Sequence, residues 1–213
     1  MAPPPAGPRV NLGVRPKSGR LLWVESCRTL DGRDRPGAGI EGMKMTRVRL
    51  IVFDLDETLV HATEVPFPYA HTFQVGPYFV YVRPFASELI KFCASHFEVA
   101  VWSSSSEHYV ETVTAELFGT KFPVEFSWAV SKCVQKVDPR SNGYVYVKDL
   151  RKAMKHGYSA DEIIMIDDSP EKRQRQPRQH LCLQAFSGDP LDTELLGVIE
   201  RIKVMAEIQS TAA

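Results

Sequence analysis

The sequence predicts an α/β fold in which a parallel central sheet is flanked by helices. Short apolar runs of the kind found in buried strands alternate along the chain with longer segments of helical periodicity. This alternation favours parallel pairing of the strands. Polar residues follow several of the apolar runs directly, at the strand ends where open α/β sheets place their ligand sites.

Four apolar runs predict the main strands of the sheet. They are rich in β-branched and aromatic residues, and each is long enough for a buried strand. The runs are residues 49–54, 97–101, 162–166 and 181–183, with a further short strand expected at 124–128.

Two smaller β segments are expected outside the central sheet. Alternating residues on both sides of Val75-Gly76-Pro77 predict a hairpin, preceded by a loop at 61–70. Residues 131–147 predict a small β insert with a turn at 141–143. Because little chain is left for anything larger, we expect no large cap domain.

Helix signals separate the expected strands. Pro84, at a favoured first position, predicts the start of one helix. Ser104 and Glu107 form a capping-box pattern for a second helix. A last amphipathic helix is expected after Asp189-Pro190. Its predicted inward residues are Leu195, Leu196, Val198, Ile199 and Ile202.

Composition indicates one globular domain with an N-terminal extension. The 213 residues are 44% hydrophobic and 24% charged, with a formal net charge of zero. Residues 1–45 are basic and rich in proline and glycine, which predicts a flexible extension, and residues 46–208 predict the domain. Residues 1–47 carry nine basic and four acidic side chains, so the remainder has a net charge of −5. An acidic main portion argues against direct nucleic-acid binding.

Cysteine spacing and hydropathy exclude several classes of protein. The four cysteines are scattered without a CxxC pair, which argues against a zinc site and fits a reducing compartment. No apolar stretch is long enough for a membrane span, and the N-terminus lacks the apolar core of a secretory signal. We therefore expect an intracellular protein, nuclear or cytoplasmic, with a mitochondrial location less favoured.

Two aspartates at the end of the first apolar run carry the most specific signal. Asp54 and Asp56 are two positions apart, and residues with this spacing in a strand point the same way. Two carboxylates so close together are costly unless a cation offsets them. The structural alternative is a loop in which an aspartate caps the next turn.

Asp54-Leu55-Asp56-Glu57-Thr58 resembles the DxDxT signature of the haloacid-dehalogenase-like (HAD-like) aspartyl phosphatases. Within them, the chain resembles the FCP and small-CTD-phosphatase branch, the NLI-interacting-factor group, over about residues 48–205. The resemblance implies a HAD-like, Rossmannoid sheet. Further landmarks occur in the order of the family: Arg83-Pro84, residues 101–105, residues 146–150, residues 166–170 and residues 192–195.

The resemblance implies catalytic roles for the signature residues. Asp54 is expected to be the nucleophile and a metal ligand. Asp56 is expected to protonate the leaving alcohol and then to activate water, with its backbone carbonyl facing the metal. Two carboxylates can divide these roles when their environments differ. Thr58 is expected to fix the loop and to orient Asp56 through its hydroxyl.

The later landmarks imply the rest of the site. Ser103 and Ser104 are expected to bind the phosphoryl oxygens, although the serine run could simply cap a helix. Lys148 is expected to neutralise the phosphoryl group and the nucleophile. Asp167 and Asp168 are expected to complete a Mg²⁺ shell, and which of them contacts the metal stays open. Small CTD phosphatases have Asp-Asn here, so the second carboxylate should tighten metal binding.

The implied activity is that of a Mg²⁺-dependent serine/threonine protein phosphatase that forms an aspartyl-phosphate. The expected substrate is a phosphoprotein or phosphopeptide, with the C-terminal domain of RNA polymerase II as the example from the family. Two alternatives stay open: a catalytically silent scaffold of the mitochondrial-import-receptor type, and a small-metabolite HAD phosphatase.

Two further groups of residues are candidates for peptide contacts. Aromatic residues near the insert could grip a proline beside the phosphoresidue: Phe126, Trp128, Tyr144 and Tyr146. A basic run is either a solvated face or a binding strip for an acidic or phosphorylated peptide: Lys172, Arg173, Arg175 and Arg178.

Overall fold

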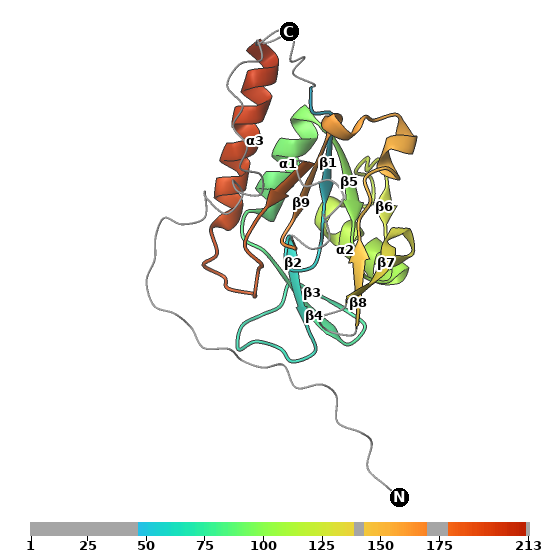
Figure 1. Cartoon of the computed structure of the whole chain (residues 1–213). Coiled ribbons are helices and arrows are strands. Elements are labelled where there is room, and N and C mark those ends of the chain that lie inside the picture. The colour runs from blue at the N-terminus through green and yellow to red at the C-terminus, as the bar shows by residue number, and fades with distance from the viewer. Residues whose placement is uncertain (1–46, 139–142, 170–178, 212–213) are drawn as a thin grey trace, which may run out of the picture. The chain divides into compact units, whose positions relative to one another are not determined.

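The computed structural model describes residues 47–138, 143–169 and 179–211 (Figure 1). No helix within these ranges combines the length and the apolar character that a membrane span requires. Three expectations lie outside the described residues: the extension 1–45, the first part of the turn at 141–143, and the basic run Lys172, Arg173, Arg175 and Arg178.

A five-stranded parallel sheet forms the centre of the domain, in the spatial order β10-β9-β1-β5-β6. The last residue of β1, Phe53, pairs with Val101 on one side and with Ile166 on the other. Helices flank this sheet, which confirms the predicted fold class (Figure 1). Its strands are β1 (Leu50–Phe53), β5 (Glu98–Trp102), β6 (Ser127–Trp128), β9 (Ile163–Asp167) and β10 (His180–Cys182).

Two hydrophobic clusters cover opposite faces of the sheet. All four residues of β1 are buried, and alternate residues of a strand face opposite sides. Ile51 and Phe53 pack toward the α-helices, whereas Leu50 and Val52 pack against residues 150–158. The helices are α1 (Ala86–His96), α2 (Glu107–Phe118) and α3 (Glu194–Thr211), with short 3-10 turns η1 (Val130–Lys132), η2 (Ala153–His156) and η3 (Ala160–Glu162).

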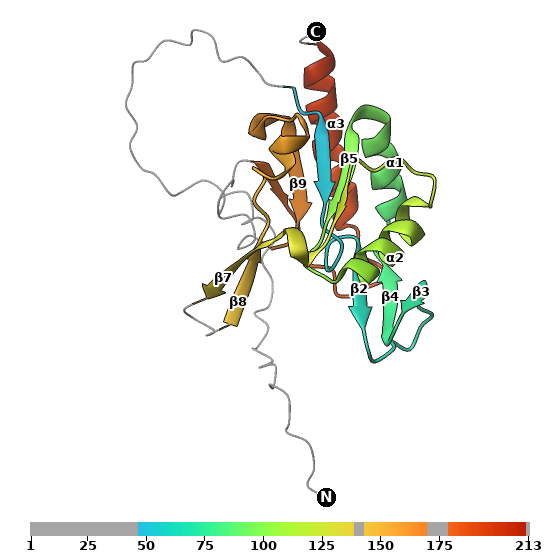
Figure 2. The same ribbon diagram turned by 90° about the vertical axis from the view of Figure 1, so that its right-hand side faces the viewer.

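Two small antiparallel inserts stand at the end of the domain where the central strands finish (Figure 2). The first has the strand order β2-β4-β3, and the second is the β7-β8 hairpin. In the view of Figure 2 they lie on opposite sides of this end. Their strands are β2 (Val60–Thr63), β3 (Phe73–Val75), β4 (Tyr78–Val82), β7 (Val134–Asp138) and β8 (Gly143–Val147).

Three predicted boundaries were wrong. Residues 61–63, expected at the start of a loop, belong to β2, because this strand pairs along its length with β4. Helix α1 begins two residues after Pro84, since Phe85 takes a left-handed conformation with φ 67°. Helix α2 begins after Ser106 rather than Ser104, and the expected capping box is not what starts it.

The last helix also differs from its prediction at two points. It begins at Glu194, whose N–H donates a hydrogen bond of 3.0 Å to the Asp192 carboxylate. The cap therefore comes three residues later than Asp189, where the sequence placed it. Leu196 is 43% exposed instead of inward, whereas the other four predicted core positions of this helix are buried.

Candidate active site

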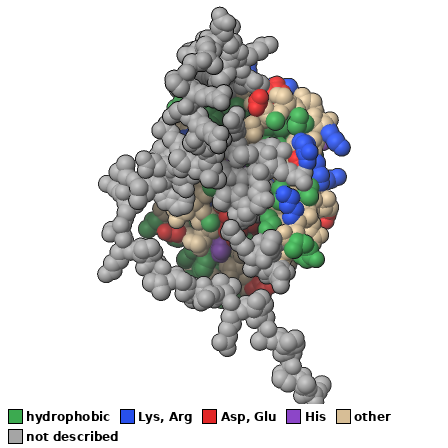
Figure 3. All heavy atoms as spheres, viewed as in Figure 1, with side chains coloured by type: hydrophobic (Ala, Val, Ile, Leu, Met, Phe, Trp, Pro, Cys, Tyr) green, Lys and Arg blue, Asp and Glu red, His purple; other side chains and the backbone are tan. Residues whose placement is uncertain are grey.

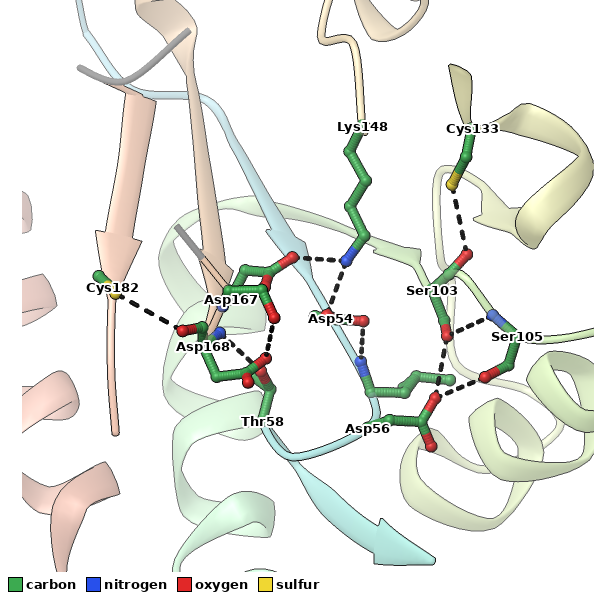
Figure 4. A network of polar contacts seen from close by, with 12 residues as sticks. Asp54, Asp56, Thr58, Ser103, Ser105, Cys133, Lys148, Asp167, Asp168 and Cys182 are labelled. Atoms are coloured by element: carbon green, nitrogen blue, oxygen red, sulfur yellow. Dashed lines mark hydrogen bonds and ion pairs between the residues drawn. The ribbon is translucent and has the colours of Figure 1, made fainter. Parts of the chain in front are cut away.

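The predicted site residues converge at the carboxyl ends of three neighbouring strands (Figure 4). Asp54 directly follows β1, Ser103 directly follows β5, and Asp167 is the last residue of β9. Because β1 lies between β5 and β9, parallel pairing brings these three ends together. The structure therefore brings together the polar residues that follow the apolar runs in the sequence.

Lys148 joins the first and third of these strands through two buried ion pairs. Its Nζ lies 2.8 Å from Oδ2 of Asp54 and 2.6 Å from Oδ2 of Asp167. All three residues are 1% exposed. Buried charges persist only when they are paired and hydrogen-bonded, so these contacts fix one another. Lys148 lies directly after β8. The sequence alone could not show that this segment passes beside the ends of β1 and β9.

Three carboxylates gather beside this lysine. Asp54, Asp167 and Asp168 each offer one oxygen, and these oxygens lie within 4.8 Å of one another. One ammonium group cannot balance three ionised carboxylates, so the cluster keeps an excess of negative charge. Oxygen donors with such an excess are the ligands that Mg²⁺ prefers. The donor set therefore fits the predicted metal.

A tight turn directly after β1 places the second aspartate. The Leu55 carbonyl accepts hydrogen bonds from the N–H groups of Thr58 and Leu59, at 3.2 and 2.8 Å. Glu57 has a left-handed φ of 57°, which is uncommon for a residue with a side chain. The Leu55 N–H donates to Oδ1 of Asp54 at 2.8 Å and so holds the first aspartate against the turn.

Thr58 ties this turn to the end of β9 rather than to Asp56. Its Oγ1 accepts a hydrogen bond of 3.2 Å from the Asp168 N–H. Among the described residues this contact takes the place of the one predicted with Asp56, whose carboxylate is bonded by other hydroxyls. The expectation that Thr58 fixes the loop agrees with its buried position.

Three hydroxyl groups surround the Asp56 carboxylate. Oδ2 accepts hydrogen bonds from Ser105 Oγ at 2.7 Å and from Ser103 Oγ at 3.2 Å. Oδ1 accepts one from the Tyr109 hydroxyl at 2.6 Å. The side chain of Asp56 thus faces β5 and α2, so the metal contact predicted for this residue would fall to its backbone carbonyl.

The sequence reasoning missed two of these three hydroxyls. Ser105 belongs to the serine run after β5, and that run was the available signal. Tyr109 is 8% exposed on the inner side of α2 and has the character of a core residue in the sequence. Burial and, secondly, the nearby Asp56 carboxylate raise the pKa of Tyr109.

The serine run forms a turn between β5 and α2. The Ser103 N–H donates to the Trp128 carbonyl at 2.9 Å, which extends the pairing of β5 with β6. The Ser105 N–H donates to Ser103 Oγ at 3.1 Å. Ser104 is half-buried between them. This turn presents hydroxyls near the start of a helix, where backbone N–H groups favour anions.

Two further contacts with backbone carbonyls support the turn. The guanidinium of Arg83 is fully buried and donates through Nη1 to the Thr58 carbonyl at 3.2 Å. The Phe186 N–H donates to the Glu57 carbonyl at 2.7 Å. The DxDxT turn is therefore held by segments from both halves of the domain.

The fold is that of the HAD-like hydrolases. Residues 49–212 match the family model described as NLI interacting factor-like phosphatase, and the chain belongs to this family. The predicted resemblance is confirmed.

Curated relatives and a solved structure give the same picture. CTD small phosphatase-like protein 1 of Caenorhabditis elegans is 29% identical over 162 residues, covering 73% of this chain and 31% of its own. Nuclear envelope morphology protein 1 of Saccharomyces cerevisiae is 24% identical over 177 residues, covering 73% and 38%. The structure of Fcp1, an essential RNA polymerase II CTD phosphatase, shares the fold with a TM-score of 0.50 at 18% identity, covering 76% and 50%. The chain thus spans half or less of the length of these proteins.

Proposed function

We propose that this chain is a Mg²⁺-dependent serine/threonine protein phosphatase that forms an aspartyl-phosphate on Asp54. The buried Lys148 between Asp54 and Asp167 is the observation that carries this proposal. A carboxylate that attacks an anionic phosphate ester needs fixed positive charge at the point of attack. Lys148 supplies one charge at hydrogen-bond distance from the nucleophile.

The carboxylate cluster supports the proposed dependence on Mg²⁺. Asp54, Asp167 and Asp168 would hold Mg²⁺, together with the backbone carbonyl of Asp56. The bound ion would neutralise phosphoryl oxygens and so lower the repulsion between substrate and nucleophile.

In the first half of the reaction, an Asp54 oxygen attacks phosphorus and the bond from phosphorus to the serine or threonine oxygen breaks. Asp56 in its protonated form gives its proton to that leaving oxygen. The hydroxyl of Ser103, with Ser104 and the N–H groups at the start of α2, holds the phosphoryl oxygens, and Lys148 offsets their charge.

In the second half, Asp56 is a carboxylate and takes a proton from water. The water oxygen bonds to phosphorus, the bond to Asp54 breaks, and inorganic phosphate leaves. The cycle ends with Asp54 ionised and Asp56 protonated, as it began. One residue can serve as acid and then as base because the proton that it gives up is the one that it later regains.

A protein substrate is supported by the two inserts beside the site, which are small sheets rather than an enclosing domain (Figure 2). On the β7-β8 hairpin, Tyr144 is 63% and Tyr146 is 36% exposed, so both could contact a peptide. Phe126 is 7% exposed and stacks on Trp128 with ring centroids 3.9 Å apart, which makes it a core residue instead.

The names of relatives favour a phosphorylated peptide. Lys and Arg side chains gather along one margin of the described surface in Figure 3. Near η2, Lys155 is exposed, and the exposed Arg151 is ion-paired with Asp149 at 2.6 Å. Because relatives are named CTD phosphatases, we propose peptides like the RNA polymerase II C-terminal domain as substrates. Relatives named for the nuclear envelope favour a nuclear location.

Hydrolysis of an aryl phosphate with and without Mg²⁺ tests the proposal. The native chain should turn over only with Mg²⁺, and Asp54→Asn should abolish turnover. Asp161→Asn is the matched control, because Asp161 is an exposed carboxylate bonded to Gln179.

A panel of phosphopeptides and sugar phosphates then separates the remaining alternatives. Preference for phosphoserine peptides supports the proposal, whereas preference for sugar phosphates indicates a metabolite phosphatase. A folded native chain without any turnover indicates the scaffold alternative and contradicts the proposal.

A further inference from the structure

The two oxygens of the Asp56 carboxylate have different partners. Oδ1 accepts a hydrogen bond of 2.6 Å from the Tyr109 hydroxyl, whereas Oδ2 faces two serine hydroxyls. We propose that Tyr109 is a positioning residue that holds Oδ1, so that Oδ2 is the oxygen that delivers the proton to the leaving alcohol. This inference rests on the proposed function and names a residue beyond the DxDxT signature.

The partners of Oδ2 suit an oxygen that gains and loses a proton. Serine hydroxyls rotate and can donate or accept, so Ser105 can stay bonded to Oδ2 in either protonation state of Asp56. Ser103 also bonds Oδ2 and is the residue proposed to hold the substrate phosphate. Oδ2 therefore lies on the side of the carboxylate that faces Ser103, the proposed phosphate ligand (Figure 4).

Tyr109 suits the oxygen that stays unprotonated. A tyrosine hydroxyl is ordinarily protonated at neutral pH, so Tyr109 continues to donate to Oδ1. A hydrogen bond of 2.6 Å to a carboxylate is in the short, charge-assisted range. While Tyr109 donates to Oδ1, the proton of the acid form is directed to Oδ2.

Tyr109 is itself fixed independently of the DxDxT turn. It lies in the first turn of α2, next to Val110, which packs in the core under the sheet. Its ring meets the ring of Tyr78 edge-on, with centroids 6.3 Å apart. When a phosphate takes the hydroxyl of Ser103, Asp56 loses one partner but keeps this anchor on its other oxygen.

The test compares substrates with different leaving groups. An aryloxide leaves without much help, whereas the alkoxide of serine must be protonated as it leaves. The ratio kcat/KM reports the steps up to formation of the aspartyl-phosphate. Tyr109→Phe should lower kcat/KM for a phosphoserine peptide about 10- to 100-fold, and for p-nitrophenyl phosphate by less than about threefold.

Tyr158→Phe is the matched control. Tyr158 is 5% exposed and its hydroxyl lies near the Glu98 carboxylate, but Glu98 begins β5 at the opposite end from the site. This variant loses the same atom in a similar setting and should leave both substrates unchanged. The melting temperature of both variants, measured with and without Mg²⁺, checks that they are folded.

Each outcome decides one question. A selective loss on the phosphoserine peptide, matched by Asp56→Asn, supports the positioning role. Equal losses on both substrates, or no loss on either, would mean that the hydroxyl only supports the fold, and the inference would be overturned. If the native chain hydrolyses neither substrate, the proposed function itself has failed.

Discussion

Arg83 and Asp192 form a bidentate ion pair that joins the segment after β4 to the segment before α3. Nε and Nη2 of the arginine each donate at 2.9 Å to one oxygen of the carboxylate. The arginine side chain is fully buried, and the aspartate side chain is 18% exposed. Through Nη1 the same guanidinium reaches the Thr58 carbonyl. The start of α3 is thereby connected to the turn that carries the predicted nucleophile.

Asp192→Asn should strongly destabilise the domain. It leaves the buried Arg83 without its charge partner, and breaking such a pair costs about 3 kcal/mol in free energy of unfolding. Urea denaturation measures the loss. Asp189→Asn is the control, since Asp189 is exposed in the same segment and caps only the Leu191 N–H. Equal effects of the two variants would contradict a special role for the ion pair.

Lys148→Met should abolish turnover and make folding depend on the metal. Without the ammonium group, Asp54 and Asp167 face each other buried and unbalanced, so we expect a drop of at least about 100-fold in kcat. Added Mg²⁺ should raise the melting temperature of this variant more than that of the native chain. Exposed Lys155→Met should change neither quantity. Full activity of Lys148→Met would refute the assignment.

Asp168→Asn should keep turnover but require more Mg²⁺. An amide oxygen can replace a carboxylate oxygen as a ligand, but the site loses one negative charge. The concentration of Mg²⁺ that gives half of the maximal rise in melting temperature should increase about tenfold. Unchanged Mg²⁺ affinity would mean that Asp168 lies outside the metal site.

The sequence predicted the positions that follow from local patterns. Asp54 and Asp167 could be placed because each ends an apolar run, and parallel strands end together. The Phe85 conformation that delays α1 and the partner of Arg83 were not predictable, because both depend on contacts between distant segments. The contact of Tyr109 with Asp56 was not predicted for a related reason. A tyrosine on the apolar face of a helix has the sequence pattern of a core residue, and the sequence does not show which carboxylate lies beside it.

Stability should fall at alkaline pH because of Cys93. This thiol is fully buried in α1, and burial raises its pKa from 9.0 to about 12. Above pH 9 the unfolded thiol ionises while the folded one stays neutral. The free energy of unfolding therefore decreases by about 1.4 kcal/mol per pH unit, beginning near the unfolded pKa and levelling off at the folded one.

Urea denaturation between pH 8 and about pH 10, below the range where buried tyrosines add to the effect, measures this slope. Cys93→Ala should lower stability at every pH but flatten the slope in this interval. A slope as steep as that of the native chain would assign the pH dependence to other groups.

The central position of β1 determines when the proposed active site can assemble during synthesis or refolding. The nucleophile lies early in the chain, whereas β9, its neighbour on one side, is synthesised only after both inserts. A nascent or truncated chain that ends before β9 would carry the complete DxDxT turn and still be inert. Contacts between segments so far apart in the chain form slowly. During refolding, the rate at which the proposed phosphatase activity returns would therefore report the rate at which β9 pairs with β1.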